Sequence, residues 1–160
     1  MIKASQILNI PIYATTQLRD KLGGTCSELS LDNVVEYVDK SAFSMWVPDI
    51  QKHFKPEDGP HEVVIVGIES HICVTQTAID LLASGHKVYV LADGVSSCNP
   101  QEVPIALDRL RKEGAVVTTS ESFLFECMGD AGISEFRQIS ALVKDTKSST
   151  KSALETLCKI

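Results

Sequence analysis

The chain has 160 residues, of which 44% are hydrophobic and 22% charged, the proportions of an ordinary globular protein of one domain. Its net charge of −6 at pH 7 argues against nucleic acid as a partner, because general nucleic-acid binding needs a basic face. No apolar run is long enough to span a membrane, and the first residues lack the core of a signal peptide, so we expect no membrane partner.

The chain begins with residues 1–8, whose apolar positions predict the end of a helix. Residues 10–16 are predicted to form a strand, with Pro11 near its start, where a missing N–H is tolerated. A parallel α/β sheet rarely opens with the tail of a helix, so we expect that something which normally precedes this helix is absent. Residues 17–33 are predicted to be a polar loop, in which Gly23-Gly24 marks a turn.

A short strand is predicted at residues 34–38, and Lys40 follows at its carboxyl end. Phe43 and Trp46 come next and are candidates to line an apolar pocket, although aromatic residues near a strand end are as often part of the core. A short helix is predicted from about 48 to 54, with a proline in its first turn.

The clearest strand is residues 63–68, because an uninterrupted aliphatic run is typical of a strand that is buried on both faces. Helical periodicity begins at Val74 and is predicted to stop at Ser84-Gly85. Cys73 therefore lies where a strand gives way to a helix, near free N–H groups and the positive end of the helix dipole. This position favours the nucleophilic thiolate. An isolated cysteine is more often a small buried hydrophobe, so both interpretations stay open.

The second half of the chain continues the alternation of strands and helices. The predicted elements are a strand at 87–93 ended by Gly94, an amphipathic helix at 101–113, a strand at 115–120, and helices at 121–128 and 134–143. The polar tail at 144–160, with one amphipathic turn at Ala153-Leu154-Leu157, is predicted to be weakly ordered.

This order of elements predicts the α/β fold class, in a three-layer α/β/α, Rossmann-like arrangement with a mostly parallel sheet. Residues 1–143 would form the domain, and residues 144–160 the tail. Ligands of such sheets bind outside the carboxyl ends of the strands. The predicted strand ends bring several polar positions to that edge: Thr15-Thr16, Lys40, Gly67 to Cys73, Asp93 to Ser97, and Ser120.

Lys40 and Cys73 are the candidates with the clearest chemistry, because a lysine beside a thiol favours the thiolate and stabilises developing negative charge. A solvated loop lysine is the alternative. The backbone N–H groups of residues 69–72 are candidates for an oxyanion hole. For His71 we favour a structural or rim role over that of a base for Cys73, which is close in sequence but need not face it.

Two further groups at this edge have a weaker signal. We interpret Asp93 as a carboxylate that accepts backbone N–H bonds in its turn. Ser96-Ser97 are candidates to hydrogen-bond a substrate.

Cysteines stand at positions 26, 73, 98, 127 and 158 and histidines at 53, 61, 71 and 86, with no C-x-x-C pair and no HxxxH spacing. Only His71 lies near a cysteine, and nothing else in its loop completes a ligand set. We therefore predict no metal and no cofactor. Free thiols indicate a reducing compartment, most simply the cytoplasm.

Several of these segments resemble the isochorismatase-like hydrolases, the cysteine hydrolase superfamily that also holds nicotinamidases. Residues 63–82, V-V-I-V-G-I-E-S-H-I-C-V-T-Q-T-A-I-D-L-L, are similar to the cysteine loop of that family. Weaker similarities lie at 10–17, 39–45, 88–97 and 116–121. The resemblance covers roughly residues 4–143 and is strongest to the eukaryotic isochorismatase domain-containing proteins.

The resemblance implies a catalytic triad of Asp, Lys and Cys, in which Cys73 matches the nucleophile and Lys40 the lysine. It also implies a cis peptide between Ile68 and Glu69, so that the N–H groups of Glu69 and Cys73 would face the substrate oxygen. With Thr16, Phe43, Trp46 and His71 as candidate pocket residues, these positions make up the predicted site.

The chain departs from the family pattern at its beginning. The family's Asp ends a first strand, and no such strand occurs before Ile10. That strand would lie between the strands at 10–16 and 63–68. Either the chain is a shortened form, or the two neighbouring strands pair directly, or another chain fills the gap. The nicotinamidase metal motif is also absent after residue 16.

Two hypotheses about function follow. The first is an isochorismatase-like hydrolase of small molecules, impaired by the absence of its general base. The second is a non-catalytic binding or scaffold protein that keeps the fold. The resemblance and the gap in the sheet both favour a homo-oligomer.

Overall fold

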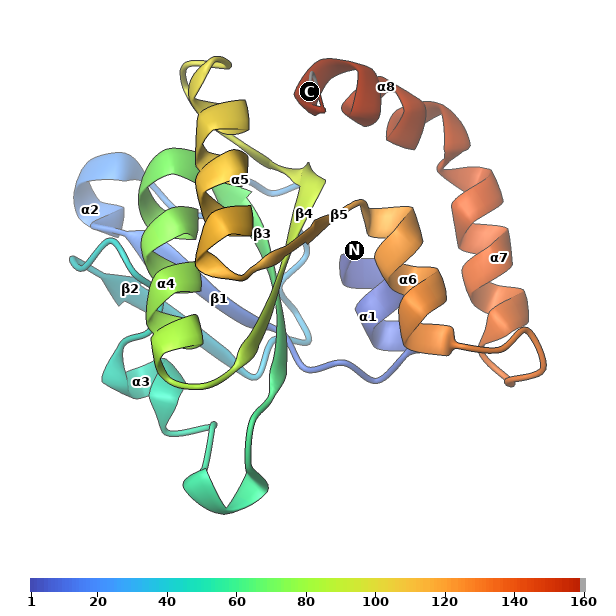
Figure 1. Cartoon of the computed structure of the whole chain (residues 1–160), viewed down its shortest axis with the longest axis horizontal. Helices are drawn as coiled ribbons and strands as arrows, with labels where there is room; N and C mark the ends of the chain where they lie inside the picture. Colours follow the sequence, from blue (N-terminus) through green and yellow to red (C-terminus); the bar gives the residue numbers. More distant parts are fainter. Residues whose placement is uncertain (159–160) are drawn as a thin grey trace.

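The computed structural model describes residues 1–158, and its strands lie in two parallel groups. In the first group β1 (Tyr13–Gln17) pairs with β2 (Glu36–Lys40). The second has the order β3-β4-β5, formed by β3 (Glu62–Ile68), β4 (Lys87–Ser96) and β5 (Val116–Thr118). The predicted α/β class with parallel strands is confirmed (Figure 1).

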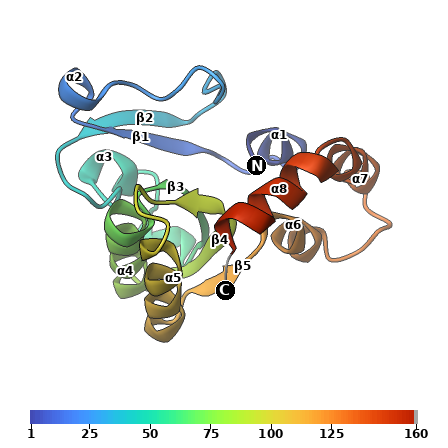
Figure 2. The same cartoon turned by 90° about the horizontal axis from the view of Figure 1, so that it is seen from above.

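The sheet is split between β1 and β3. Within residues 1–158, no strand pairs with both of them, and they do not pair with each other. Figure 2 shows the β1–β2 pair set apart from β3, β4 and β5. Direct pairing of these two neighbours, one of the arrangements left open by the sequence, is therefore not found. That a strand is missing at this place stays a prediction.

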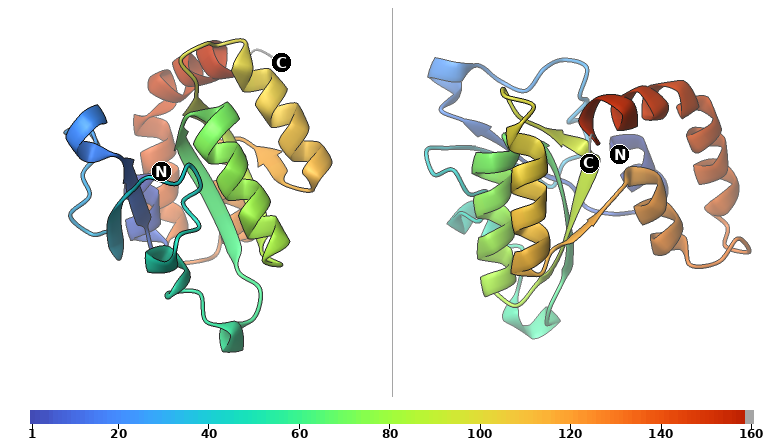
Figure 3. Two further views of the ribbon diagram at one scale, coloured as in Figure 1. Left: turned by 90° about the vertical axis from the view of Figure 1, so that its left-hand side faces the viewer. Right: turned by 45° about the horizontal axis from the view of Figure 1, so that its top comes forward.

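Two helices cover one face of the larger strand group. α4 (Thr75–Ala83) and α5 (Glu102–Glu113) lie side by side against β3 and β4 (Figure 3). The main core fills this interface with small and branched side chains: Ile65, Ala78, Leu81, Val88, Val90, Ala92, Leu107 and Leu110. Along β4 the residues between these, Tyr89 and Leu91, pack with Phe123 on the other face. The alternation shows that β4 is covered on both sides, as a central parallel strand requires.

On the second face, α6 (Ser120–Met128) packs against β4, which also contacts α8 (Lys147–Leu157). The helices α1 (Ile2–Ile7) and α7 (Phe136–Asp145) pack with α6 beyond it (Figure 1). Their apolar faces meet in a smaller core of Ala4, Leu124, Met128 and Ile139. The helix predicted for residues 1–8 is thus present and buries its apolar face.

The prediction that Gly94 ends its strand is wrong, because β4 continues to Ser96. Between Ile65 and Gly67 the register with β3 shifts, so β4 carries extra residues opposite β3 in a bulge. A Cβ on Gly94 would lie 2.9 Å from Cγ1 of Val66. The glycine allows a close approach of two strands here, and does not break the strand.

The remaining elements are short or lie at the surface. They are α2 (Arg19–Leu22), α3 (Pro48–Gln51), η1 (Pro56–Asp58) and α8 (Lys147–Leu157). The tail therefore has a helix where the sequence predicts a weakly ordered segment with one amphipathic turn. Residues 159 and 160 of that tail lie outside the described residues. No helix in the described part of the chain is both long and apolar enough to cross a membrane.

Candidate functional site

Cys73 lies in η2 (Ser70–Val74), a π-helical turn that runs directly into α4. The helical segment thus begins four residues earlier than the sequence periodicity predicts, and the half-buried Cys73 is in its first turn. The Cys73 carbonyl accepts a hydrogen bond from the Thr77 hydroxyl at 2.6 Å. That hydroxyl oxygen in turn accepts the backbone N–H of Met45 at 2.8 Å. Thr77 therefore ties the segment after Lys40 to the turn that carries Cys73.

The turn before Cys73 is anchored by Ser70, which is fully buried. Its N–H donates to the Ser97 hydroxyl at 3.1 Å, and its own hydroxyl donates to the Ser96 carbonyl at 2.9 Å. The Ser97 hydroxyl also lies 2.9 Å from Nδ1 of His71. Ser97 and His71 thus join the loops after β3 and β4. This arrangement fits the structural role favoured for His71 and gives Ser97 a structural role as well.

Lys40 is the last residue of β2 and is only 7% exposed. Its ammonium group donates to Oε1 of Gln17 at 2.7 Å and to the carbonyls of Ala42 and Phe43, each at 2.9 Å. Burial lowers the pKa of Lys40 below its ordinary value, whereas the negative charges of a Cys73 thiolate and of Asp39 act to raise it. The solvated-lysine interpretation is therefore wrong, because the ammonium group of Lys40 is buried and held by three oxygen atoms.

Thr16 binds Asp39, the residue that precedes Lys40 in β2. Its hydroxyl donates to Oδ1 of Asp39 at 2.8 Å, and the same oxygen accepts the N–H of Arg19 at 2.9 Å. These two hydrogen bonds lower the pKa of the Asp39 carboxyl, the Arg19 N–H having the larger effect. Thr16 is buried and its hydroxyl is engaged, so it holds the end of β2.

The two aromatic candidates for the pocket have different surroundings. Phe43 is 51% exposed, and its carbonyl binds Lys40. Trp46 packs against the main core, with its ring centroid 5.0 Å from that of Phe54 and 5.2 Å from that of His86. Trp46 is therefore part of the core, which was the alternative to a role in lining a pocket.

The peptide bond between Ile68 and Glu69 is cis, as the resemblance implied. Asp93 accepts hydrogen bonds, but from the backbone N–H and hydroxyl of Ser120 at the start of α6, at 2.7 and 2.5 Å. The prediction that its donors come from its own turn is therefore wrong, because residues 94–96 continue the strand. Asp93 instead fixes the start of α6 to the end of β4.

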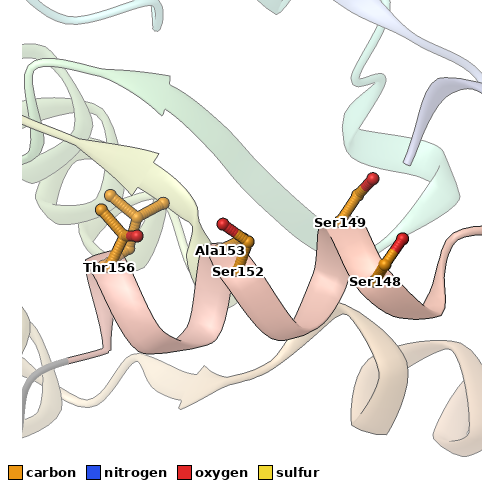
Figure 4. Close-up of a pocket in the computed structure, with 6 residues that line it drawn as sticks. Ser148, Ser149, Ser152, Ala153 and Thr156 are labelled. Atoms are coloured by element: carbon orange, nitrogen blue, oxygen red, sulfur yellow. The ribbon is translucent and has the colours of Figure 1, made fainter.

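The surface has two hollows apart from Cys73 and Lys40. One, of about 570 Å³, is lined by residues of α8 alone, most of them serine or threonine, and Figure 4 shows Ser148, Ser149, Ser152, Ala153 and Thr156 along that helix. The other, of about 540 Å³, is lined by Ser5, Gln6, residues 9–12 and Asn33. Neither is lined by Cys73 or Lys40, and neither gathers groups with catalytic chemistry.

Comparison with known proteins shows the family of the chain. Residues 1–122 match the family model of the isochorismatase domain. The chain belongs to the isochorismatase family. It is 41% identical over 150 residues to "Secreted isochorismatase effector Isc1" of Phytophthora sojae, covering 91% of this chain and 71% of that relative. It is 36% identical over 144 residues to "Isochorismatase domain-containing protein 1" of Salmo salar, covering 90% of this chain but only 51% of the relative.

Solved structures of this family have the same fold. The structure of "MAR1 Ribonuclease from Caenorhabditis elegans" aligns with a TM-score of 0.82 and 33% identity, covering 89% of this chain and 73% of that one. The chain thus has the isochorismatase fold over most of its length, although its relatives are longer.

Sequence reasoning missed three side chains that build the isochorismatase site here. Gln17 holds Lys40 and also donates from Nε2 to the Ser41 carbonyl at 2.7 Å. Ser70 and Thr77 anchor the cysteine turn. Gln17 follows the strand predicted at 10–16 and so lies at the same edge as Lys40, and Ser70 lies in the stretch from Gly67 to Cys73 that was placed at that edge, but neither side chain was given a role. Thr77 carried no signal.

Proposed function

We propose that this isochorismatase-family chain is a hydrolase of small molecules with Cys73 as its nucleophile. The observation that supports this most strongly is the burial of Lys40, whose pKa a negative charge on Cys73 would raise. Lysine is almost never buried without a charged partner. Here the three hydrogen-bond acceptors of its ammonium group are neutral oxygens, so a thiolate at Cys73 is a natural countercharge.

In the proposed mechanism the Cys73 sulfur attacks an amide-like carbon of the substrate. A C–S bond forms as the carbonyl electrons move to oxygen, and the N–H groups of Glu69 and Cys73 stabilise that oxyanion. The oxyanion then collapses, the bond to the leaving group breaks, and the leaving group takes up a proton from water. Water finally attacks the thioester and regenerates Cys73. All three protons of Lys40 are engaged, so Lys40 acts through its charge.

The alternative is a binding or scaffold protein with this fold, and one observation favours it. Among residues 1–158, no carboxylate oxygen lies within 4.0 Å of the Lys40 ammonium, where the neutral Gln17 binds instead. A carboxylate there would supply a general base for the thiol and for water. The two proposals therefore differ in whether the chain turns over substrate.

The test is a panel of small amides together with isochorismate, assayed with the wild type and with Cys73→Ala. Labelling of Cys73 by a small thiol reagent at neutral pH is measured in parallel on Lys40→Met. We expect labelling of Cys73 to slow at least about fivefold in Lys40→Met, because loss of even about 1 kcal/mol of charge stabilisation has that effect.

Lys112→Met is the matched control, since Lys112 lies on the exposed side of α5 and, among residues 1–158, pairs only with Asp108. Unchanged labelling in Lys40→Met would refute the electrostatic role of Lys40. Turnover that survives Cys73→Ala would refute the nucleophile. The C. elegans neighbour is named a ribonuclease, and cleavage of RNA by this chain would overturn the small-molecule assignment, which the charge of −6 favours.

We also propose that copies of the chain associate and that it works in a reducing, cytoplasmic setting. The split sheet and the exposed apolar side chains of Val66 and Ile68 support association. The free cysteines support the compartment, since among residues 1–158 all five are unpaired. Light scattering on the purified chain tests the first proposal, and a single-copy mass would refute it. Localisation of the tagged protein tests the second.

A further inference from the structure

Three potential metal ligands come together beside the cysteine turn, from two loops that are distant in the sequence. Glu69 and His71 follow β3, and Cys98 follows β4. A carboxylate oxygen, an imidazole nitrogen and the Cys98 sulfur all lie within 4.8 Å of one another. The loop of His71 does not contain a complete ligand set in its own sequence, because Cys98 comes from another loop and reaches His71 only in the folded chain.

Hydrogen bonds orient these side chains. Oε2 of Glu69 accepts the backbone N–H of Cys98 at 2.6 Å. Nδ1 of His71 lies 2.9 Å from the Ser97 hydroxyl and 3.9 Å from Oε2 of Glu69. The side chains of Glu69 and His71 are 26% and 24% exposed, so they are held in place and still reachable from solvent. Partners of this kind fix the rotamers of metal ligands in known sites.

We propose that Glu69, His71 and Cys98 bind one Zn²⁺ ion. Thiolate, imidazole and carboxylate are its three ordinary ligands, and distances of about 2.0–2.3 Å to the metal place tetrahedral ligand atoms about 3.3–3.8 Å apart. Oε2 of Glu69 and Nδ1 of His71 are 3.9 Å apart, close to that range, and on binding Nδ1 would exchange its hydrogen bond with the Ser97 hydroxyl for the metal. Cys98 is exposed, so its side chain has room to rotate and close the remaining distance.

The identity of the ligands selects the metal. A sulfur and a nitrogen disfavour Mg²⁺ and Ca²⁺, which bind oxygen. One carboxylate and one thiolate neutralise a divalent ion, and water would complete the tetrahedron. Three protein ligands with an open fourth position are typical of sites in which the metal can meet a further ligand. The site does not depend on the proposed hydrolysis, because none of its ligand side chains takes part in that mechanism.

The experiment titrates the full chain, purified with a chelator and reduced, with Zn²⁺ by calorimetry and with Co²⁺ by absorption. We expect one ion per chain and a thiolate-to-cobalt charge-transfer band. Cys98→Ser should weaken binding at least tenfold and remove the band. His71→Ala should weaken it similarly. Cys26→Ser is the matched control, since Cys26 is also exposed but lies outside the cluster, and its affinity should equal that of the wild type.

Cys73→Ser distinguishes the proposed site from metal capture by the nucleophile, and it too should bind like the wild type. The proposal is overturned if no band forms, if Cys98→Ser keeps wild-type affinity, or if Cys73→Ser abolishes binding. Cys98 is at the surface, so its substitution tests binding without threatening the fold. Failure of the hydrolysis assays would leave these binding results unaffected.

Discussion

Replacement of Ser97 by alanine tests whether its hydroxyl holds together the two loops that frame Cys73. The change leaves the N–H of the fully buried Ser70 without its acceptor, and an orphaned buried donor costs about 1–3 kcal/mol. It also removes the contact with His71, which contributes about 1 kcal/mol. We therefore expect Ser97→Ala to lower the free energy of unfolding by about 2–4 kcal/mol.

Urea unfolding followed by circular dichroism measures this difference. With a slope of about 2 kcal/mol per molar, the midpoint should fall by about 1–2 M. Ser84→Ala is the matched control, because the exposed Ser84 hydroxyl donates only to a carbonyl of its own helix, that of Asp80. The control should stay within about 0.5 kcal/mol of the wild type. Hydrogen exchange of the Ser70 amide should also accelerate in Ser97→Ala alone.

The result that would refute this reasoning is a Ser97→Ala midpoint equal to that of the control, with unchanged exchange at Ser70. The hydroxyl would then be free to serve a substrate, which is the other role that the sequence left to Ser96-Ser97. A loss of substrate affinity with no loss of stability would point to the same conclusion.

Two further predictions concern the fold. Nδ1 of His86 accepts the backbone N–H of His61 at 3.1 Å, and burial, with a smaller contribution from the charge of His61, lowers the pKa of His86 below its ordinary 6.5. Below 6.5 the unfolded chain thus binds more protons, so stability should fall as the pH drops from 6.5 toward the folded-state value. His86→Asn keeps an acceptor and should flatten this dependence in urea midpoints, and an unchanged slope would contradict the assignment. Gly94→Ala should destabilise by about 1–3 kcal/mol because its Cβ meets Val66, and Val66→Ala in the same chain should recover part of that loss. Additive losses in thermal unfolding would exclude the clash.

The parts of the fold that the sequence predicted best are those fixed by local patterns. The aliphatic run of β3 and the helical periodicity after Cys73 predicted that strand and α4 nearly to the residue. The short apolar pattern at residues 34–38 likewise placed Lys40 at the end of a strand. Gly94 shows where local reasoning fails, because a glycine that permits close packing of strands looks in sequence like one that ends a strand.

The parts of the site that escaped prediction depend on contacts between distant segments. Nothing near Gln17 indicates that its amide oxygen binds Lys40, since the partnership arises only when β1 and β2 pair in register. The cluster of Glu69, His71 and Cys98 arises in the same way from the pairing of β3 with β4. Sequence patterns place residues at a sheet edge, and the register decides which of them touch.

The geometry of the site predicts that its two chemical steps proceed at very different rates. In the proposed mechanism, attack on the substrate needs only the Cys73 sulfur and the positive charge of the buried Lys40. Attack by water on the thioester needs a general base. Within the described residues, Lys40 has Gln17 as its partner in place of a carboxylate, and Nδ1 of His71 is engaged by Ser97.

An activated ester such as p-nitrophenyl acetate has a leaving group that needs no proton, so the first step should go forward unaided. Intact-mass analysis should then show an acetyl group on Cys73 that accumulates to about one per chain and is released slowly, as a burst of nitrophenolate followed by a slow phase. Cys73→Ser should remove the burst, and Cys26→Ser should keep it. Rapid turnover without an accumulating adduct would show that a base reaches the site after all, and it would make the chain a complete enzyme. Absence of both adduct and turnover would instead favour the scaffold, because a thiolate held beside a buried lysine cannot remain unreactive toward so good a substrate.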